Sequence, residues 1–120
     1  KDVFVADDII ATGDSMLRLC RHLKADGARN IFLNATFALF TEGKEKFQKA
    51  YEEGLFTAVL STNLTYTCPC VKEAEWFIEA DLSKYVSYII AYCNPNKSVA
   101  DLLSCSERIK TLLHDKHQQQ

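Results

Sequence analysis

The sequence predicts an α/β fold in which helices cover a parallel sheet in three layers. Three observations predict it. Short apolar runs alternate with longer segments whose apolar residues recur at helical spacing. The connections between these segments are short, and strand–helix–strand units joined in this way form parallel sheets through right-handed crossovers. The second apolar run, 30–36, is almost uninterrupted, which is typical of a strand whose two faces are both covered.

The first half of the chain contains two strand–helix units. We predict a strand over 2–6, a helix over 15–26, a strand over 30–36 and a helix over 42–53. Glycine at position 27 ends the first helix, because glycine readily adopts the left-handed conformation found there. The apolar stripes that define the two helices are Met16, Leu19, Cys20 and Leu23, and Phe47, Ala50 and Tyr51.

The second half continues the alternation with a longer interruption. We expect a third strand over 56–61, a polar loop over 62–73 and a fourth strand over 75–80. A helix over 81–93 follows, and Ser98 caps a last helix that runs to about His114. These elements place one domain at 1–115 and a disordered tail at 116–120.

Composition excludes several classes of partner. The 120 residues carry 14 basic and 16 acidic side chains, so the net charge of −2 argues against binding to nucleic acid or to an anionic membrane surface. No apolar run approaches the ~20 residues of a membrane span. Because the chain opens at Lys1 without a methionine and enters a strand at once, we interpret it as a piece of a longer protein.

The five cysteines do not form an even disulfide framework, which indicates reduced thiols and a cytoplasmic location. Cys68 and Cys70 are the only close pair, separated by Pro69. A metal site needs more ligands than these two, and their spacing is not the usual two-residue gap. We therefore interpret them as two incidental thiols in a loop, with a metal or redox role as the alternative.

The most informative segment is the end of the first strand. There the apolar run meets Asp7 and Asp8, and a Thr-Gly-Asp-Ser turn leads directly into a helix. Such a turn presents unpaired N–H groups and the positive end of the helix dipole, which together favour a phosphate. The two neighbouring carboxylates are suited to sugar hydroxyls or to Mg²⁺. In parallel sheets ligands bind beyond the carboxyl ends of the strands, where this segment is expected to lie.

The stretch from Val5 to Ser15 resembles the phosphoribosyl-pyrophosphate-binding motif of type I phosphoribosyltransferase folds, in which two acids precede Thr-Gly and a small hydroxyl residue. Three later segments resemble the ribose-phosphate diphosphokinases of that fold in particular. They are 31–43, which is similar to the stretch Ala-Thr-His-Gly-Leu-Phe-Ser-Gly, 59–64, which is similar to a strand followed by Thr-Asn-Thr, and 97–103, which is similar to Glu-Ser-Val-Ser-x-Leu-Phe. The resemblance runs from about residue 2 to residue 103.

The resemblance implies the C-terminal part of an enzyme of nucleotide biosynthesis that transfers diphosphate from ATP to ribose 5-phosphate, giving phosphoribosyl pyrophosphate and AMP. It implies Mg²⁺ as cofactor, held by Asp7 and Asp8, and a homo-oligomer. It assigns no catalytic residue to this chain. The ATP side would come from sequence before Lys1 and from other subunits, so we expect the chain alone to be inactive. The substrate-binding residues that it implies are Asp7, Asp8, Ala11, Thr12, Gly13, Asp14 and Ser15.

The chain departs from the family pattern at several positions. Ala11 stands where the family usually has Asp, and Phe37 and Ala38 replace His and Gly. Asp14 lies in the phosphate loop, where a carboxylate would repel a phosphate, so we expect it to face outward and to cap the helix. These departures keep a catalytically silent regulatory relative as an alternative. A nucleobase phosphoribosyltransferase is another, although the loop 62–73 is short and polar for a base-recognition segment.

Overall fold

The computed structural model describes residues 1–94 and 106–118 of the 120-residue chain, in two compact units, Lys1–Leu82 and Ser83–Gln120. In the described parts of the chain, no helix combines the length and the apolar character that crossing a membrane requires.

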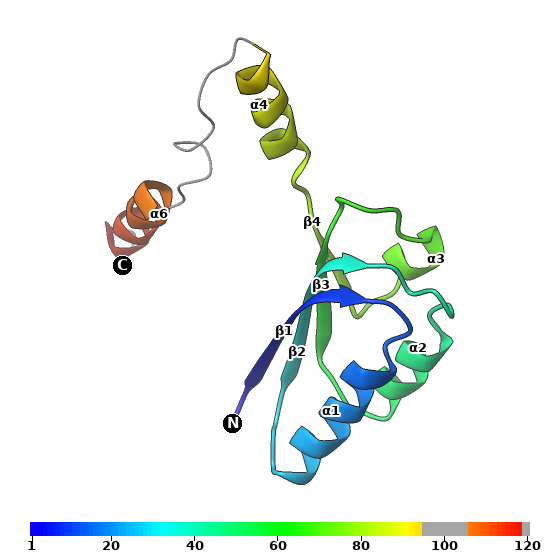
Figure 1. Ribbon diagram of the computed structural model, residues 1–120. Helices are drawn as coiled ribbons and strands as arrows, with labels where there is room; N and C mark the ends of the chain where they lie inside the picture. Colours follow the sequence, from blue (N-terminus) through cyan, green and yellow to red (C-terminus); the bar gives the residue numbers. More distant parts are fainter. Residues whose placement is uncertain (95–105, 119–120) are drawn as a thin grey trace. The chain divides into compact units, whose positions relative to one another are not determined.

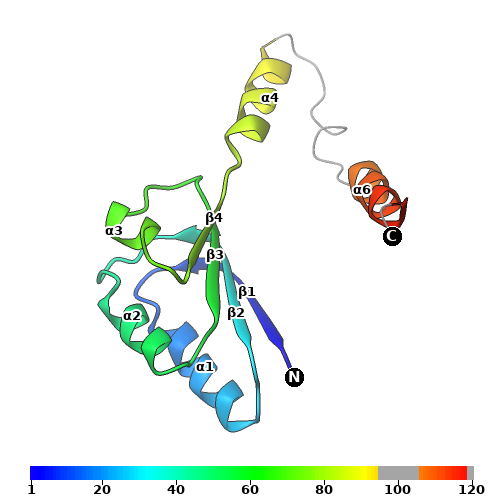
Figure 2. The ribbon, with the colours of Figure 1, turned by 180° about the vertical axis from the view of Figure 1, so that it is seen from behind.

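The first unit is built on one parallel sheet. Its strands are β1 (Val3–Ile10), β2 (Ile31–Ala38), β3 (Ala58–Thr62) and β4 (Phe77–Ala80), and they lie in the order β1-β2-β3-β4. The connecting helices are α1 (Asp14–Ala25), α2 (Glu45–Glu52) and the short α3 (Pro69–Lys72). Figures 1 and 2 show the helices on the same side of the sheet. Successive right-handed crossovers that all step in one direction produce this arrangement. The predicted α/β fold with a parallel sheet is confirmed.

The two faces of the sheet differ in burial within this unit. The row Val5, Leu33, Val59 and Phe77 packs under the helices, whereas the adjacent row Ala6, Asn34, Leu60 and Ile78 points to the other face. On that second face Phe4 is 62% exposed and Ile78 is 51% exposed. Lys1–Leu82 thus contains two layers, and the helices that the apolar run 30–36 led us to expect on the second face are not found within this unit.

The core under the helices is aromatic. Phe47 of α2 has no exposed surface, and its ring lies 4.9 Å from that of Phe40 and 5.8 Å from that of Trp76, centroid to centroid. Trp76 is also buried, and its indole Nε1 donates a hydrogen bond to Gln48 Oε1 at 2.9 Å. Such rings remove large apolar areas from water, so this cluster fixes α2 against the sheet.

Two elements of this unit differ from the sequence prediction. Strand β1 continues through the two aspartates to Ile10, because Ile9 and Ile10 pair with Phe37 and Ala38 of β2. The expected polar loop 62–73 contains α3, which begins at a proline, a residue favoured in the first turn. The other strands and helices lie within a few residues of their expected positions, and Gly27 follows the end of α1 with a φ of 89°, as predicted.

The second unit contains α4 (Ser83–Cys93) and α6 (Ser106–Gln118). The helix predicted over 81–93 is confirmed as α4. The expected cap at Ser98 and the family-like segment 97–103 lie outside the described residues. Helix α6 continues past His114 to Gln118, so residues 116–118, which the sequence assigned to a tail, are helical.

Candidate functional site

The turn between β1 and α1 has the geometry of an anion-binding loop. Gly13 stands immediately before α1 in a left-handed conformation, with φ 85° and ψ −1°. The first main-chain hydrogen bond of the helix runs from Leu17 N to Gly13 O at 2.9 Å. The amides before Leu17 therefore have no partner within the helix, and they give the start of α1 its partial positive charge.

The back of this turn is fixed to the neighbouring connection between β2 and α2. Leu39 N donates to Ile10 O at 2.8 Å, and Thr41 N donates to Ala11 O at 3.0 Å. These bonds hold the carbonyl groups of the turn away from its open side. A turn that is held in place in this way does not have to be ordered when a ligand binds.

A cavity of about 160 Å³ opens over the turn. Five of the seven predicted substrate-binding residues line it, and Ile9, Ile10 and Met16 complete the lining. The five are Asp7, Ala11, Thr12, Gly13 and Ser15. The structure therefore brings one carboxylate, two hydroxyl side chains and the amides of the turn to a single cavity.

Asp7 and Asp8 lie differently with respect to this cavity. Consecutive residues of a strand point to opposite faces of the sheet, and only Asp7 is among the lining residues. Both carboxylates are exposed, and the amide of Asp8 donates to Asp7 Oδ1 at 2.8 Å. The extension of β1 past these residues separates the two side chains, which the sequence had treated as one acidic tip.

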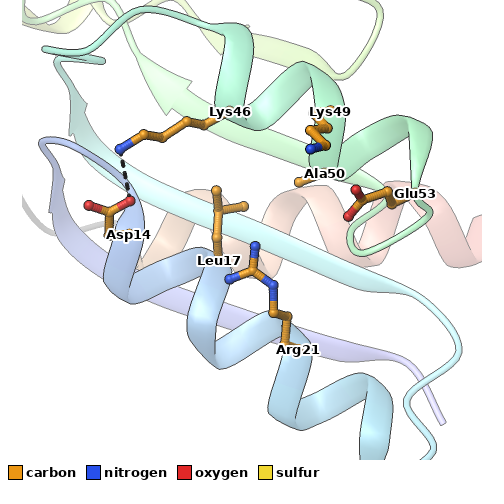
Figure 3. A pocket seen from close by; sticks show the side chains of 7 residues that line it. All are labelled: Asp14, Leu17, Arg21, Lys46, Lys49, Ala50 and Glu53. Carbon is orange, nitrogen blue, oxygen red and sulfur yellow. Dashed lines mark hydrogen bonds and ion pairs between the residues drawn. The ribbon is translucent and has the colours of Figure 1, made fainter.

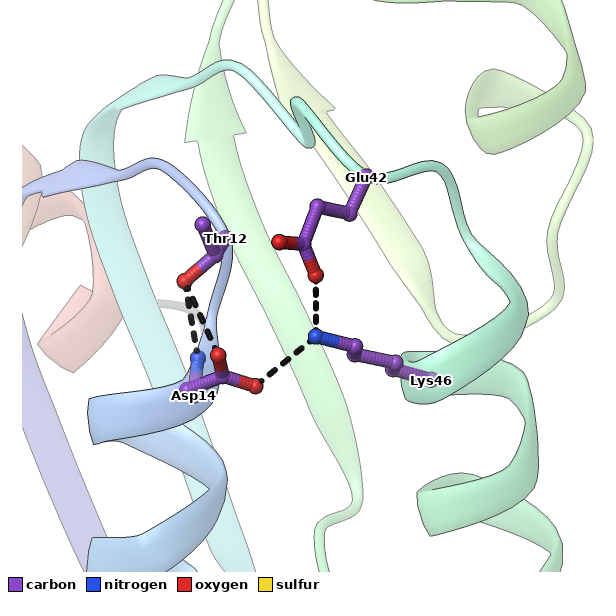
Figure 4. Close-up of polar contacts among 4 residues, drawn as sticks. All are labelled: Thr12, Asp14, Glu42 and Lys46. Carbon is purple, nitrogen blue, oxygen red and sulfur yellow. Dashed lines mark hydrogen bonds and ion pairs between the residues drawn. The ribbon is translucent and has the colours of Figure 1, made fainter.

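Asp14 is the other predicted residue that does not line the cavity. It is the first residue of α1, and its carboxylate accepts hydrogen bonds from side chains rather than from the amides of the helix, so the expected capping role is not observed. Its carboxylate instead contacts Lys46 of α2, with 3.0 Å between Oδ1 and Nζ, and Lys46 also pairs with Glu42 (Figure 4). Thr12 Oγ1 lies 3.4 Å from both Asp14 N and Asp14 Oδ2.

Lys46 offsets part of the negative charge that Asp14 brings to the turn between β1 and α1. Its hydrogen bond to Asp14 is the main cause that lowers the pKa of that carboxyl, and the charge of Lys46 adds to it. In turn Glu42 and then Asp14 raise the pKa of Lys46. All three side chains are exposed, so solvent screens the interaction. The sequence analysis missed Lys46 and Glu42, although their spacing of four residues is a readable signal for a helical ion pair.

A second cavity, of about 300 Å³, lies between α1 and α2 (Figure 3). Leu17 and Ala50 contribute its apolar part, and the other lining residues are charged: Asp14, Arg21, Lys46, Lys49 and Glu53. It is larger than the cavity over the turn, but it contains none of the turn's hydroxyl groups. We therefore place the candidate site at the smaller cavity, where main-chain amides and hydroxyl side chains converge.

The donor set at the site suits a weakly held magnesium ion. Mg²⁺ is usually bound through one or two carboxylates, with water and substrate phosphates as its other ligands. Asp7 and Asp8 are exposed carboxylates that take part in none of the ion pairs of the described residues. In the same residues no cluster of three or more His, Cys, Asp or Glu side chains is arranged to hold a metal. Asp7, the carboxylate that lines the cavity, thus fits an ion that arrives with substrate better than a structural metal.

The first unit is an α/β domain with a parallel sheet, and the candidate site lies beyond the carboxyl end of its first strand. The solved phosphoribosylpyrophosphate synthetase of Mycobacterium smegmatis has a similar fold, with a TM-score of 0.68 over 80% of this chain and 31% of that one, at 21% identity. No protein-family model matches the chain.

The sequence is similar to curated proteins named ribose-phosphate pyrophosphokinase. Over 63 residues the chain is 38% identical to the ribose-phosphate pyrophosphokinase of Thermococcus kodakarensis, a match that covers 52% of this chain and 22% of that protein. The enzyme of the same name from Mycoplasmopsis pulmonis is 26% identical over 102 residues, which are 85% of this chain and 31% of the relative. The resemblance to ribose-phosphate diphosphokinases is confirmed over part of the chain, and the chain spans less than a third of these relatives.

Proposed function

We propose that this chain supplies the ribose 5-phosphate site of a ribose-phosphate diphosphokinase. In that reaction the C1 hydroxyl of ribose 5-phosphate takes a diphosphoryl group from ATP, and phosphoribosyl pyrophosphate and AMP are the products. The observation that carries the proposal is the cavity over 11–15, where Thr12, Ser15 and the amides before Leu17 meet Asp7. The similarity to enzymes of that name supports the choice of substrate.

Each group at the cavity has a role in holding the sugar phosphate. The amides of 11–15 and the hydroxyls of Thr12 and Ser15 donate hydrogen bonds to the 5-phosphate. Gly13 lets the ligand approach the main chain, since it has no β-carbon. Asp7 accepts a hydrogen bond from a ribose hydroxyl, and Asp8 lies behind it on the other face of the strand. These contacts fix the position of the sugar rather than perform bond chemistry.

We also propose that this site uses Mg²⁺, through the carboxylate of Asp7. When bound, Mg²⁺ neutralises phosphate charge that develops during diphosphoryl transfer. Asp7, which lines the cavity, is the residue of this chain that would hold it, whereas Asp8, the other implied ligand, points to the opposite face of the strand. The groups that bind ATP are not assigned to this chain, so we propose that the 120 residues alone form no AMP and that the complete protein acts as a cytoplasmic homo-oligomer.

A titration of the ¹⁵N-labelled chain with ribose 5-phosphate tests the binding site. We expect amide shifts confined to residues 7–17, weaker shifts with inorganic phosphate and none with ribose. Thr12→Val is expected to weaken binding roughly tenfold, since it removes a hydrogen bond to a charged group. Thr41→Val is the matched control, because Thr41 is an exposed threonine of the adjacent loop and does not line the cavity. Shifts that fall elsewhere in the chain would contradict the site.

The reaction itself is tested on the longer protein. AMP release from ATP that depends on ribose 5-phosphate supports the diphosphokinase. Pyrophosphate release from phosphoribosyl pyrophosphate and a nucleobase would identify a phosphoribosyltransferase instead. Ribose 5-phosphate binding without either reaction would identify a silent regulatory relative, which is the alternative favoured by Ala11 and Phe37.

A further inference from the structure

Cys68 and Cys70 lie in sulfur contact at the start of α3. Their Sγ atoms are 2.7 Å apart, and both residues are half-buried. A covalent S–S bond is about 2.05 Å long, so a shift of well under an ångström separates the contact from a bond. Because the described residues bring no third metal-ligating side chain to this pair, the contact favours thiol chemistry over a metal site.

The main chain holds the two sulfurs together. Cys68 is extended, with φ −55° and ψ 134°, and the ring of Pro69 fixes the next φ. Val71 N then donates to Cys68 O at 2.9 Å, which closes a turn around the pair. On either side the turn is anchored by the buried residues Thr67 and Val71. The cysteines therefore meet without any rearrangement of the sheet.

The surroundings shift the pKa values of the two thiols in opposite directions. The hydrogen bond from the Cys70 thiol lowers the pKa of Cys68, and the amides of Cys70 and Val71 and the charge of Lys44 act in the same direction. The same hydrogen bond raises the pKa of Cys70. Since the thiolate is the nucleophile in disulfide exchange, Cys68 is the attacking residue and Cys70 is the resolving one.

We propose that Cys68 and Cys70 form a dithiol–disulfide site that exchanges reversibly with low-molecular-weight disulfides. In the first step the Cys68 thiolate attacks one sulfur of such a disulfide, forms a mixed disulfide and releases one thiolate. In the second step Cys70 loses its proton and attacks Sγ of Cys68, which forms the Cys68–Cys70 bond and releases the second small thiolate. That proton protonates one of the released thiolates. Two cysteine thiols are oxidised to one disulfide and one small disulfide is reduced to two thiols, so electrons and protons balance.

Trypsin gives a direct readout on the intact 120-residue chain. Cleavage after Lys49 and Lys72 releases one peptide, 50–72, that contains both cysteines and no third one. After equilibration with oxidised glutathione and quenching with an alkylating agent, we expect this peptide to lose the mass of two hydrogens and to resist alkylation. Reduction should restore two alkylation sites. A peptide that stays fully alkylatable after oxidation, or one that carries only glutathione, would overturn the proposal.

Initial alkylation rates test the assigned order of the thiols. At about pH 7 we expect Cys68 to react several-fold faster than Cys70, since reactivity follows the thiolate fraction. Cys20 serves as the slow reference, because burial raises the pKa of its thiol to about 11. In Cys70→Ser the mixed glutathione disulfide on Cys68 should accumulate, whereas Cys68→Ser should trap much less on Cys70. Equal trapping in the two variants, with their circular dichroism unchanged, would refute this order.

Discussion

Gly13 lies directly against the ring of Phe47: a β-carbon on Gly13 would come within 2.1 Å of Phe47 Cε2. Phe47 is completely buried among the aromatic rings of the core. The turn between β1 and α1 is therefore packed onto the core and is not a free surface loop. This contact links the main chain that forms the candidate site to the residues that hold the fold together.

Gly13→Ala should be strongly destabilising. The new methyl group clashes with a ring that cannot move away, and φ of 85° is also unfavourable for alanine. We expect the free energy of unfolding to fall by about 3 kcal/mol or more, as measured by urea denaturation.

Gly27→Ala is the matched control for this substitution. Gly27 has nearly the same φ, 89°, but nothing lies within 4 Å of its added β-carbon. Only the conformational cost remains, so we expect a loss of about 1 kcal/mol. Equal losses in the two variants would show that the ring of Phe47 does not constrain the turn.

The ion pair between Asp14 and Lys46 predicts a pH dependence. Because Lys46 lowers the pKa of Asp14 in the folded protein, the contribution of Asp14 to stability is present above about pH 4 and is lost as the pH falls through the lowered value. Lys46→Met should raise the pKa of Asp14 toward its ordinary value, as measured by NMR titration of the side-chain carboxyl carbon. Lys49→Met removes a neighbouring charge of the same helix that forms no ion pair with Asp14, and it should change this pKa much less.

The charge of Asp14 should also weaken phosphate binding. Asp14 begins α1, beside the turn whose amides would bind the phosphate, and Lys46 only partly screens its charge. We expect Asp14→Asn to tighten the binding of ribose 5-phosphate by a factor of about two to five at low salt, with a smaller gain at high salt. Calorimetry measures both values. Asp26→Asn makes the same change at the other end of α1 and should leave the affinity unchanged; a gain there of similar size would indicate a general charge effect.

Local signals made much of the site predictable from the sequence. The two aspartates, Thr12, Gly13 and the start of α1 lie within a dozen residues. The strand, the turn and the helix are each determined by residue types that act on their near neighbours in sequence. The same holds for the strands and for α1 and α2. Short-range periodicity sets these elements, and tertiary packing moved their ends by only a few residues.

The features that the sequence did not predict depend on distant partners. Asp14 and Lys46 are 32 residues apart, and their contact exists only because α1 and α2 lie side by side. The side chains of Asp7 and Asp8 point to opposite faces because β1 continues past them, and β1 continues because Ile9 and Ile10 pair with β2. Helix α3 has only four residues, too few for apolar periodicity to reveal it.

The buried hydroxyl of Ser61, near the carboxyl end of β3, gives a further prediction about stability. Its side chain is 2% exposed, and its Oγ has no hydrogen-bond partner. A buried hydroxyl without a partner is unfavourable, so Ser61→Ala should leave the protein equally stable or stabilise it by up to about 1 kcal/mol. Thr67→Val is the contrasting variant. Thr67 is also 2% exposed, but its Oγ1 donates to Ala38 O at 3.4 Å. Loss of this hydrogen bond should destabilise the protein by about 0.5–1 kcal/mol, with both variants measured by urea denaturation.

A clear loss of stability in Ser61→Ala would mean that the hydroxyl of Ser61 has a hydrogen-bond partner in solution. If ribose 5-phosphate then stabilised the original chain but not this variant, the site would extend from the turn after β1 to β3.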